Sequence, residues 1–273
     1  MDKVLRHRVN AGRVAVQQQV DFFRKQFGQV PSEWKEDETR VTFADFAISE
    51  RVFTELRNSF PEDDYCSEES NPLDEVSTLH ARYAWVLDPI DGTNNYALGI
   101  PFCAISLALL KDGVPVYGIL YDFSQDWILE GGPGHGLWRN GKRFTPPPHA
   151  FERKDGVVGL HFPIPDRFYD AMRPLLTRYR ARVMGSGALN LAYTALGLMD
   201  GCIDFKVKVW DIAAASALVA AVGGQIHYLQ GPAFPLKHFH VRSPLVPYVG
   251  GSAAFCDWVA QNIGLDALKA TEE

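Results

Sequence analysis

The sequence has few cysteines, no long apolar segment and no excess of positive charge. Its four cysteines lie far apart and form no C-x-x-C pair, whereas secreted domains rarely have cysteines this sparse. We therefore expect free thiols and a cytoplasmic location. The longest apolar stretches, residues 100–110 and 212–222, are too short to cross a bilayer, and the charged start of the chain leads into no apolar signal core. We expect no membrane partner.

Nucleic acid is not an expected partner either. The 27 lysines and arginines are outnumbered by 33 aspartates and glutamates, and no run of like charges suggests a tail that binds polyanions. The sequence also lacks low-complexity tracts and internal repeats. Its 273 residues, 47% of them hydrophobic, suffice for about two lobes that share a core. The acidic excess must therefore be interpreted locally.

The first sixty residues predict two helices. Apolar residues recur with helical spacing over residues 4–27. Residues 29–40 have little periodicity and indicate an exposed loop. Residues 42–45, Thr-Phe-Ala-Asp, resemble a capping box, which would start a second helix and place Asp45 in its first turn.

The rest of the chain divides at a proline run. Residues 146–148, all proline, cannot lie inside a central strand, so we expect an α+β lobe over residues 1–147 and an α/β lobe over residues 148–273. The expected elements are meander strands at 83–87, 102–110, 114–121 and 127–129, a hairpin turn at 140–141, later strands at 157–161, 182–184, 201–205 and 225–229, and later helices at 165–179, 189–198 and 212–222.

The most informative segment, residues 85–96, is a short apolar strand that runs into two aspartates and a threonine. Pro89 keeps Asp88 out of the helical conformation, and Gly92 permits a turn whose backbone N–H groups point outward beside Asp91. One turn thus offers carboxylates to a hard cation such as Mg²⁺ and N–H groups to a phosphate. The same spacing also fits a plain turn whose carboxylates bond only to their own backbone.

Two further acidic segments could complete a metal site. Glu68 and Glu69 could supply a ligand or a base, although exposed acidic pairs are usually solvated surface. Asp211 directly precedes an alanine-rich helical pattern and is expected to be its N-cap. That position lies at the positive end of a helix, where a metal-bound phosphate can also be held.

These segments together resemble a known family. The signatures are Glu68-Glu69-Ser70, then DPIDGTNNY at residues 88–96, then WDIAA at residues 210–214 followed by Gly223-Gly224. In order and spacing they are similar to those of the inositol monophosphatase family of Mg²⁺-dependent, lithium-sensitive phosphatases. The resemblance spans most of the chain. It implies a layered αβαβα sandwich of the inositol monophosphatase and sugar phosphatase type, two or three Mg²⁺ ions, and a homodimer.

The resemblance also implies roles for individual residues. Glu68 and Thr93 would orient and deprotonate the attacking water, with Asp45 behind Thr93 as a hydrogen-bond acceptor, and no covalent intermediate would form. The backbone N–H groups of Gly92 and Thr93 would hold phosphate oxygens, and Lys35 would lie near an optional third metal. The implied metal ligands are Glu68, the bridging Asp88, the carbonyl oxygen of Ile90, Asp91 and Asp211, and of these Asp91 also counts among the catalytic residues.

Departures from the family pattern concern the substrate. Asp204 stands where inositol-preferring relatives usually carry a glutamate that contacts substrate hydroxyls, and its shorter side chain could admit a different polyol. Gly185, Ser186 and Gly187 resemble the small-residue loop beside the substrate, although the same residues fit a plain strand-to-helix turn.

We therefore expect a Mg²⁺-dependent phosphomonoesterase that hydrolyses a small phosphorylated polyol, with inositol monophosphate the first candidate. The same chemistry on histidinol phosphate, fructose 1,6-bisphosphate or a nucleotide 2′- or 3′-phosphate is the alternative. A non-catalytic regulatory module that binds phosphate or metal is a second alternative. Lys206 and Lys208 are the only cations between Gly185 and Asp211, which favours a monophosphate with hydroxyls over a bisphosphate or a nucleotide.

Overall fold

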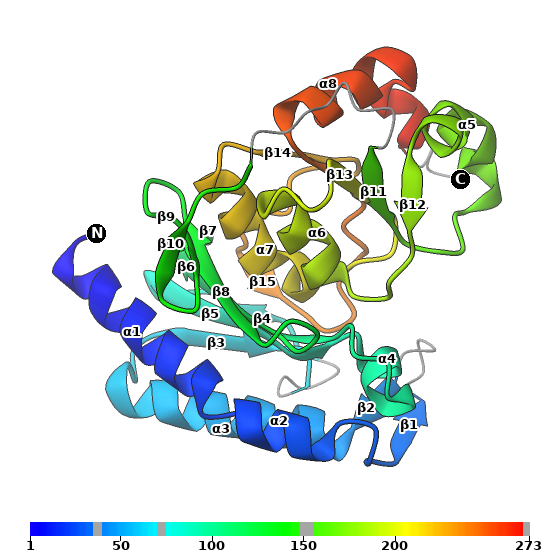
Figure 1. Cartoon of the computed structure of the whole chain (residues 1–273). Coiled ribbons are helices and arrows are strands. Elements are labelled where there is room, and N and C mark those ends of the chain that lie inside the picture. The colour runs from blue at the N-terminus through cyan, green and yellow to red at the C-terminus, as the bar shows by residue number, and fades with distance from the viewer. Residues whose placement is uncertain (35–39, 70–74, 148–155, 270–273) are drawn as a thin grey trace.

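The computed structural model of the chain describes residues 1–34, 40–69, 75–147 and 156–269. Two sheets alternate with three layers of helices (Figure 1). The structure therefore confirms the expected layered αβαβα sandwich. Within the described ranges, no helix combines the length and apolar character needed to cross a membrane.

The first helical layer packs on one face of a seven-stranded sheet (Figure 1). Its helices are α1 (Lys3–Gln17), α2 (Val20–Gln26) and α3 (Phe43–Ser59). The sheet has the order β10 (Lys142–Phe144), β9 (Gly136–Arg139), β8 (Trp127–Gly132), β7 (Val114–Asp122), β6 (Ala104–Lys111), β5 (Tyr83–Asp91) and β3 (Asp64–Ser67). Neighbouring strands from β5 to β10 pair antiparallel, which confirms the predicted meander and its hairpin at Asn140.

The second sheet is mixed and lies between two helical layers. Its order is β12 (Arg180–Arg182), β11 (Val157–Leu160), β13 (Gly201–Asp204), β16 (Tyr248–Gly251) and β14 (Gln225–Tyr228). The central layer consists of α6 (Gly187–Ala195) and α7 (Val209–Ala221), and the outer layer of η1 (Asp166–Phe168), α5 (Tyr169–Arg178), α8 (Ala253–Asn262) and η2 (Leu265–Leu268) (Figure 1). The smaller elements are α4 (Thr93–Leu98), β1 (Ser32–Trp34) paired with β2 (Arg40–Thr42), and β4 (Ser77–Thr78) paired with β15 (His238–Phe239).

Three hydrophobic clusters of buried side chains hold the five layers together in the described part of the chain. Val52 and Trp85 belong to the core between α3 and the first sheet. Leu189 and Ile212 belong to the core of the central helices, and Phe255 to the core between α8 and the second sheet. The central helices therefore join the two sheets. The predicted division into lobes 1–147 and 148–273 stays a prediction.

Three local predictions were wrong. The single helix expected over residues 4–27 is broken into α1 and α2 near Gln19, whose side-chain amide donates to the carbonyl of Ala15, and Phe23 then packs against Tyr96. The expected loop at residues 29–40 contains β1 and the first residue of β2, because β1 pairs antiparallel with β2, the strand that directly precedes α3.

The third error concerns the start of α7. Asp211 is not the N-cap, because the helix begins two residues earlier at Val209. Val209 and Trp210 are buried in the central core, so packing extends the helix towards its N-terminus. Asp211 lies in the first turn instead, where its Oδ2 accepts the backbone N–H of Lys208 at 2.7 Å. The sequence pattern also missed β3, β16 and α8.

Candidate active site

β5 ends in the two aspartates of the predicted site. In a regular strand, residues three positions apart point to opposite faces. The pairing of β5 with β6 shifts register between Asp88 and Asp91, and such a bulge re-aims side chains. Both residues are buried, and the backbone N–H of Ile90 between them donates to Asp88 Oδ1 at 3.1 Å. The bulge thus lets the two carboxylates meet on one side.

A third carboxylate, that of Asp211 on α7, lies next to these two although it is 120 residues further along the chain. Among the described residues, oxygen atoms of Asp88, Asp91 and Asp211 all lie within 4.8 Å of one another. Burial raises the pKa of Asp88 and of Asp211 well above the usual range, and the neighbouring acidic groups raise both further. Burial also raises the pKa of Asp91, to about 7. Two buried acids and a half-buried third at this spacing favour a cation between them.

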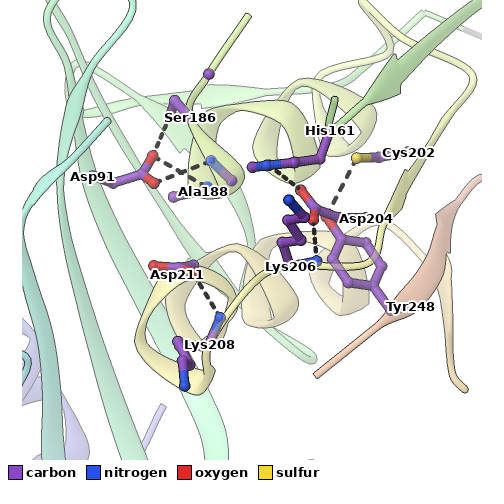
Figure 2. A network of polar contacts seen from close by, with 12 residues as sticks. Asp91, His161, Ser186, Ala188, Cys202, Asp204, Lys206, Lys208, Asp211 and Tyr248 are labelled. Atoms are coloured by element: carbon purple, nitrogen blue, oxygen red, sulfur yellow. Dashed lines mark hydrogen bonds and ion pairs between the residues drawn. The ribbon is translucent and has the colours of Figure 1, made fainter. Parts of the chain in front are cut away.

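Asp91 also holds the start of α6, which the sequence did not indicate. Its carboxylate accepts hydrogen bonds from the Ser186 hydroxyl, from the backbone N–H of Gly187 at 3.0 Å and from that of Ala188 at 3.1 Å (Figure 2). Ser186 is itself the N-cap, since its hydroxyl accepts the N–H of Leu189. The predicted substrate loop at residues 185–187 is therefore tied to a predicted metal ligand, and its substrate contacts stay a prediction.

Glu68 lies beside the cluster. It follows β3, which is parallel to β5, and its backbone N–H donates to the carbonyl of Leu87 at 3.3 Å. The side chain is half-buried, and its charge contributes to the raised pKa values of Asp88 and Asp211. The parallel pairing of β3 and β5 therefore brings the predicted base next to the aspartates.

The side chains of Thr93 and Asp45 lie close together beside the turn that follows β5. The Thr93 hydroxyl donates to the carbonyl oxygen of Ile90 at 2.8 Å, and Asp45 Oδ1 lies 3.5 Å from the same hydroxyl. Asp45 Oδ2 accepts both the N–H and the hydroxyl of Thr42, which confirms the predicted capping box. Burial raises the pKa of Asp45 to about 8. The structure thus brings Asp45 close to Thr93, as the resemblance implied.

Asn95 is a residue whose role the sequence analysis missed. Its side-chain amide donates to the carbonyls of Phe102 at 2.8 Å and Met184 at 2.6 Å. It therefore ties the loop before α6 to the turn that follows β5. The only available signal was its place within the aspartate motif.

Two other predicted residues are less directly placed. Asp204 has no exposed surface in this structure, and its predicted substrate contact stays a prediction. His161, which the sequence analysis did not single out, lies beside it (Figure 2). Lys35 falls outside the described residues.

The donor set fits a divalent cation of the magnesium type. The converging atoms are carboxylate oxygens, which Mg²⁺ prefers, and Oδ1 of Asp91 keeps a lone pair beyond the one that accepts the N–H of Gly187. Three carboxylates this close together, two of them buried, are unfavourable without a compensating charge. The cluster is therefore a candidate metal centre.

Comparison with known proteins agrees with this geometry. Residues 1–253 match the model of the inositol monophosphatase family. An inositol-1-monophosphatase of Mesorhizobium japonicum is 32% identical over 197 residues, which cover 70% of this chain and 73% of that protein. A fructose-1,6-bisphosphatase/inositol-1-monophosphatase of Aquifex aeolicus is 27% identical over 249 residues, which cover 87% and 88%.

A solved structure supports the same assignment. The inositol monophosphatase from Anabaena (Nostoc) sp. PCC 7120 superposes with a TM-score of 0.76 and 26% identity, over 95% of this chain and 96% of that one. The family match spans nearly the whole chain, and the acidic cluster lies where the motif predicted a metal. The chain therefore belongs to the inositol monophosphatase family, whose members are Mg²⁺-dependent phosphoric monoester hydrolases.

Proposed function

We propose that this phosphatase hydrolyses the phosphate monoester of a small polyol, with inositol monophosphate as the first candidate, and that it uses two Mg²⁺ ions. The convergence of Asp88, Asp91 and Asp211 carries the proposal. Such a buried acidic cluster repels a phosphate ester unless cations neutralise it. The names of the relatives from Mesorhizobium and Aquifex support the substrate class.

The residues have distinct parts in this reaction. Glu68, Asp88, Asp91, Asp211 and the Ile90 carbonyl would hold the metal ions. Bound Mg²⁺ acidifies a coordinated water and neutralises phosphate charge. The half-buried Glu68 is the group available to accept a proton from the attacking water, and Thr93 orients that water through its hydroxyl.

Fructose 1,6-bisphosphate is the second candidate substrate. The name of the Aquifex relative includes that activity, although the few cations near the turn favour a monophosphate. Histidinol phosphate and nucleotide 2′- or 3′-phosphates are further candidate substrates, which the assay below distinguishes. A non-catalytic binding module is disfavoured because the residues implied for catalysis are all present in the sequence.

The first test is phosphate release with Mg²⁺ over a panel of inositol 1-phosphate, fructose 1,6-bisphosphate, histidinol phosphate and NADP. We expect inositol 1-phosphate to give the highest kcat/KM. The variant Asp91→Asn should lower kcat/KM by about a hundredfold or more, because one carboxylate of the cluster loses its charge. Asp170→Asn is the matched control, since that carboxylate is exposed on α5 and should leave activity unchanged.

Two outcomes would contradict the proposal. Folded, Mg²⁺-loaded protein that releases no phosphate from any substrate would favour the binding module. Asp91→Asn protein that folds and keeps full activity would remove the acidic cluster from the mechanism. Circular dichroism separates loss of activity from loss of fold.

The predicted homodimer and cytoplasmic location are part of the same proposal. All four cysteines are free and buried, in keeping with a reducing compartment. Light scattering of the purified protein would test the dimer, which is expected at twice the 30.5 kDa chain mass.

A further inference from the structure

A histidine and an aspartate face each other at the carboxyl ends of β11 and β13, two interior strands of the second sheet. β11 and β13 are parallel, and their register pairs Leu160 with Ile203, so the following His161 lies opposite Asp204. Both therefore lie at the carboxyl ends of their strands. In open α/β sheets, ligands bind at this edge. The helix α6, with Ser186 as its N-cap, follows β12, and α7, with Asp211 in its first turn, follows β13, and both strands are parallel to β11.

The carboxylate of Asp204 is buried and only half satisfied. Its Oδ1 accepts the backbone N–H of Lys206 at 2.9 Å. Its Oδ2 has no hydrogen-bond partner in the described part of the chain. Tyr248, its neighbour in register on β16, directs its hydroxyl to the sulfur of Cys202 instead. A buried carboxylate oxygen without a partner is costly, so its retention calls for an explanation.

The group nearest to that oxygen is an imidazole that reaches the surface. His161 Nδ1 lies 3.7 Å from Asp204 Oδ2, and the His161 side chain is 37% exposed while that of Asp204 is fully buried. A shift of well under 1 Å would turn this contact into a hydrogen bond. Because Nδ1 faces the carboxylate, the opposite ring nitrogen, Nε2, faces away from it.

The surroundings of His161 favour the uncharged form of its imidazole ring. Burial lowers the pKa of His161, and the nearby Lys206 ammonium lowers it further. Burial raises the pKa of Asp204 to about 7, against the effect of its bond to the N–H of Lys206. A mostly uncharged imidazole offers a directed hydrogen bond, which suits a hydroxyl better than a phosphate.

We propose that His161 is a specificity-determining residue whose Nε2 bonds to a hydroxyl of the polyol leaving group, and that Asp204 is the positioning residue that orients the ring. This inference rests on the proposed function. It reassigns the expected direct contact of Asp204, which is buried, to the histidine in front of it. In this arrangement the acidic cluster, with its cations, binds the phosphate of the substrate, and His161 binds a hydroxyl of the polyol.

The test compares two substrates that share a phosphate ester but differ in hydroxyls. We expect His161→Ala to lower kcat/KM about tenfold or more for the polyol phosphate that the wild type cleaves best, chiefly through KM. For p-nitrophenyl phosphate, which has no hydroxyl, the change should stay below about twofold. His80→Ala is the control, because His80 is an exposed histidine outside this edge.

A second variant tests the positioning role of Asp204. Asp204→Asn keeps the shape of the side chain but removes its charge, and it should lower kcat/KM for the polyol phosphate without lowering the melting temperature. In the His161→Ala background the same change should have no further effect, because the two residues act as one unit. A merely structural role would instead lower activity on both substrates and add in the double variant.

The outcomes separate this inference from the proposed function. If the His161→Ala variant cleaved polyol phosphates as well as the wild type does, the inference alone would be overturned. Equal losses on both substrates would also overturn it. Wild-type protein that cleaves p-nitrophenyl phosphate but no polyol phosphate would overturn both the inference and the proposed function.

Discussion

Gly92 shows how one residue type can be required by the backbone around it. Its φ of 82° lies in the left-handed region, and it joins the end of β5 to α4. A Cβ at this position would lie 3.0 Å from the carbonyl oxygen of Phe102 and 3.1 Å from that of Gly185. Both neighbours are backbone atoms that cannot turn aside. The turn between the aspartates and Thr93 therefore depends on glycine.

We predict that Gly92→Ala destabilises the fold by about 2–3 kcal/mol and lowers kcat at least tenfold, because strain and contact act together. Urea unfolding and phosphate release with Mg²⁺ measure the two effects. Gly134→Ala is the matched control, since Gly134 has a φ of 74° but open space around it. It should cost about 1 kcal/mol and leave kcat unchanged. Equal effects of the two variants would show that the contacts at Gly92 are unimportant.

Among the secondary-structure elements, α6 is fixed most directly to the site. Its N-cap hydroxyl, on Ser186, both receives the N–H of Leu189 and donates to Asp91. The first turn of the helix therefore positions a predicted metal ligand, while the ligand in turn satisfies N–H groups of the helix. Loss of the Ser186 cap should therefore affect both the stability of α6 and the position of Asp91.

We predict that Ser186→Ala lowers the free energy of unfolding by about 1–2 kcal/mol and lowers activity about tenfold. Ser252→Ala removes an equivalent cap, since Ser252 accepts the N–H of Phe255 at the start of α8, away from the acidic cluster. It should lower stability by a similar amount with normal activity. Activity unaffected by Ser186→Ala would mean that Asp91 needs no support from α6.

Across the whole molecule, the acidic site is a source of instability in the absence of metal. Its carboxylates come from both β5 and α7, so their mutual repulsion acts across the layers. The folded pKa values of Asp91 and Asp45 are about 7 and 8, both above the ordinary value of 3.8. Between pH 3.8 and these folded pKa values the folded protein binds more protons than the unfolded protein, so stability falls as pH rises over this range and is constant above it.

We therefore predict that the melting temperature of protein in EDTA falls as the pH rises from roughly 4 to roughly 8 and levels off above that. Mg²⁺ should stabilise the protein more at the higher pH, because the cation binds the ionised carboxylates. Differential scanning fluorimetry over this range measures both effects. Asp91→Asn should flatten the pH dependence, whereas Asp170→Asn should not. A melting temperature that rises with pH in EDTA would contradict the assignment of these buried acids.

Predictions from the sequence succeeded where the controlling interactions are local. Residues 42–45 formed the expected capping box because all its bonds join near neighbours. The meander from β5 to β10 followed from alternating patterns and short turns. The start of α7 was misplaced because Asp211 resembles a cap, while burial of Val209 and Trp210, which the pattern does not reveal, extends the helix.

The sequence by itself determined the chemistry of the aspartate turn, because Asp88, Asp91 and Gly92 are within five residues of one another. Only the tertiary structure decided which distant groups join them. The bulge in β5 turns the two carboxylates to one side, and the packing of α7 brings Asp211 to them. The parallel register of β11 and β13 sets His161 against Asp204. Such long-range contacts depend on strand register and layer packing, which local patterns of residues do not encode.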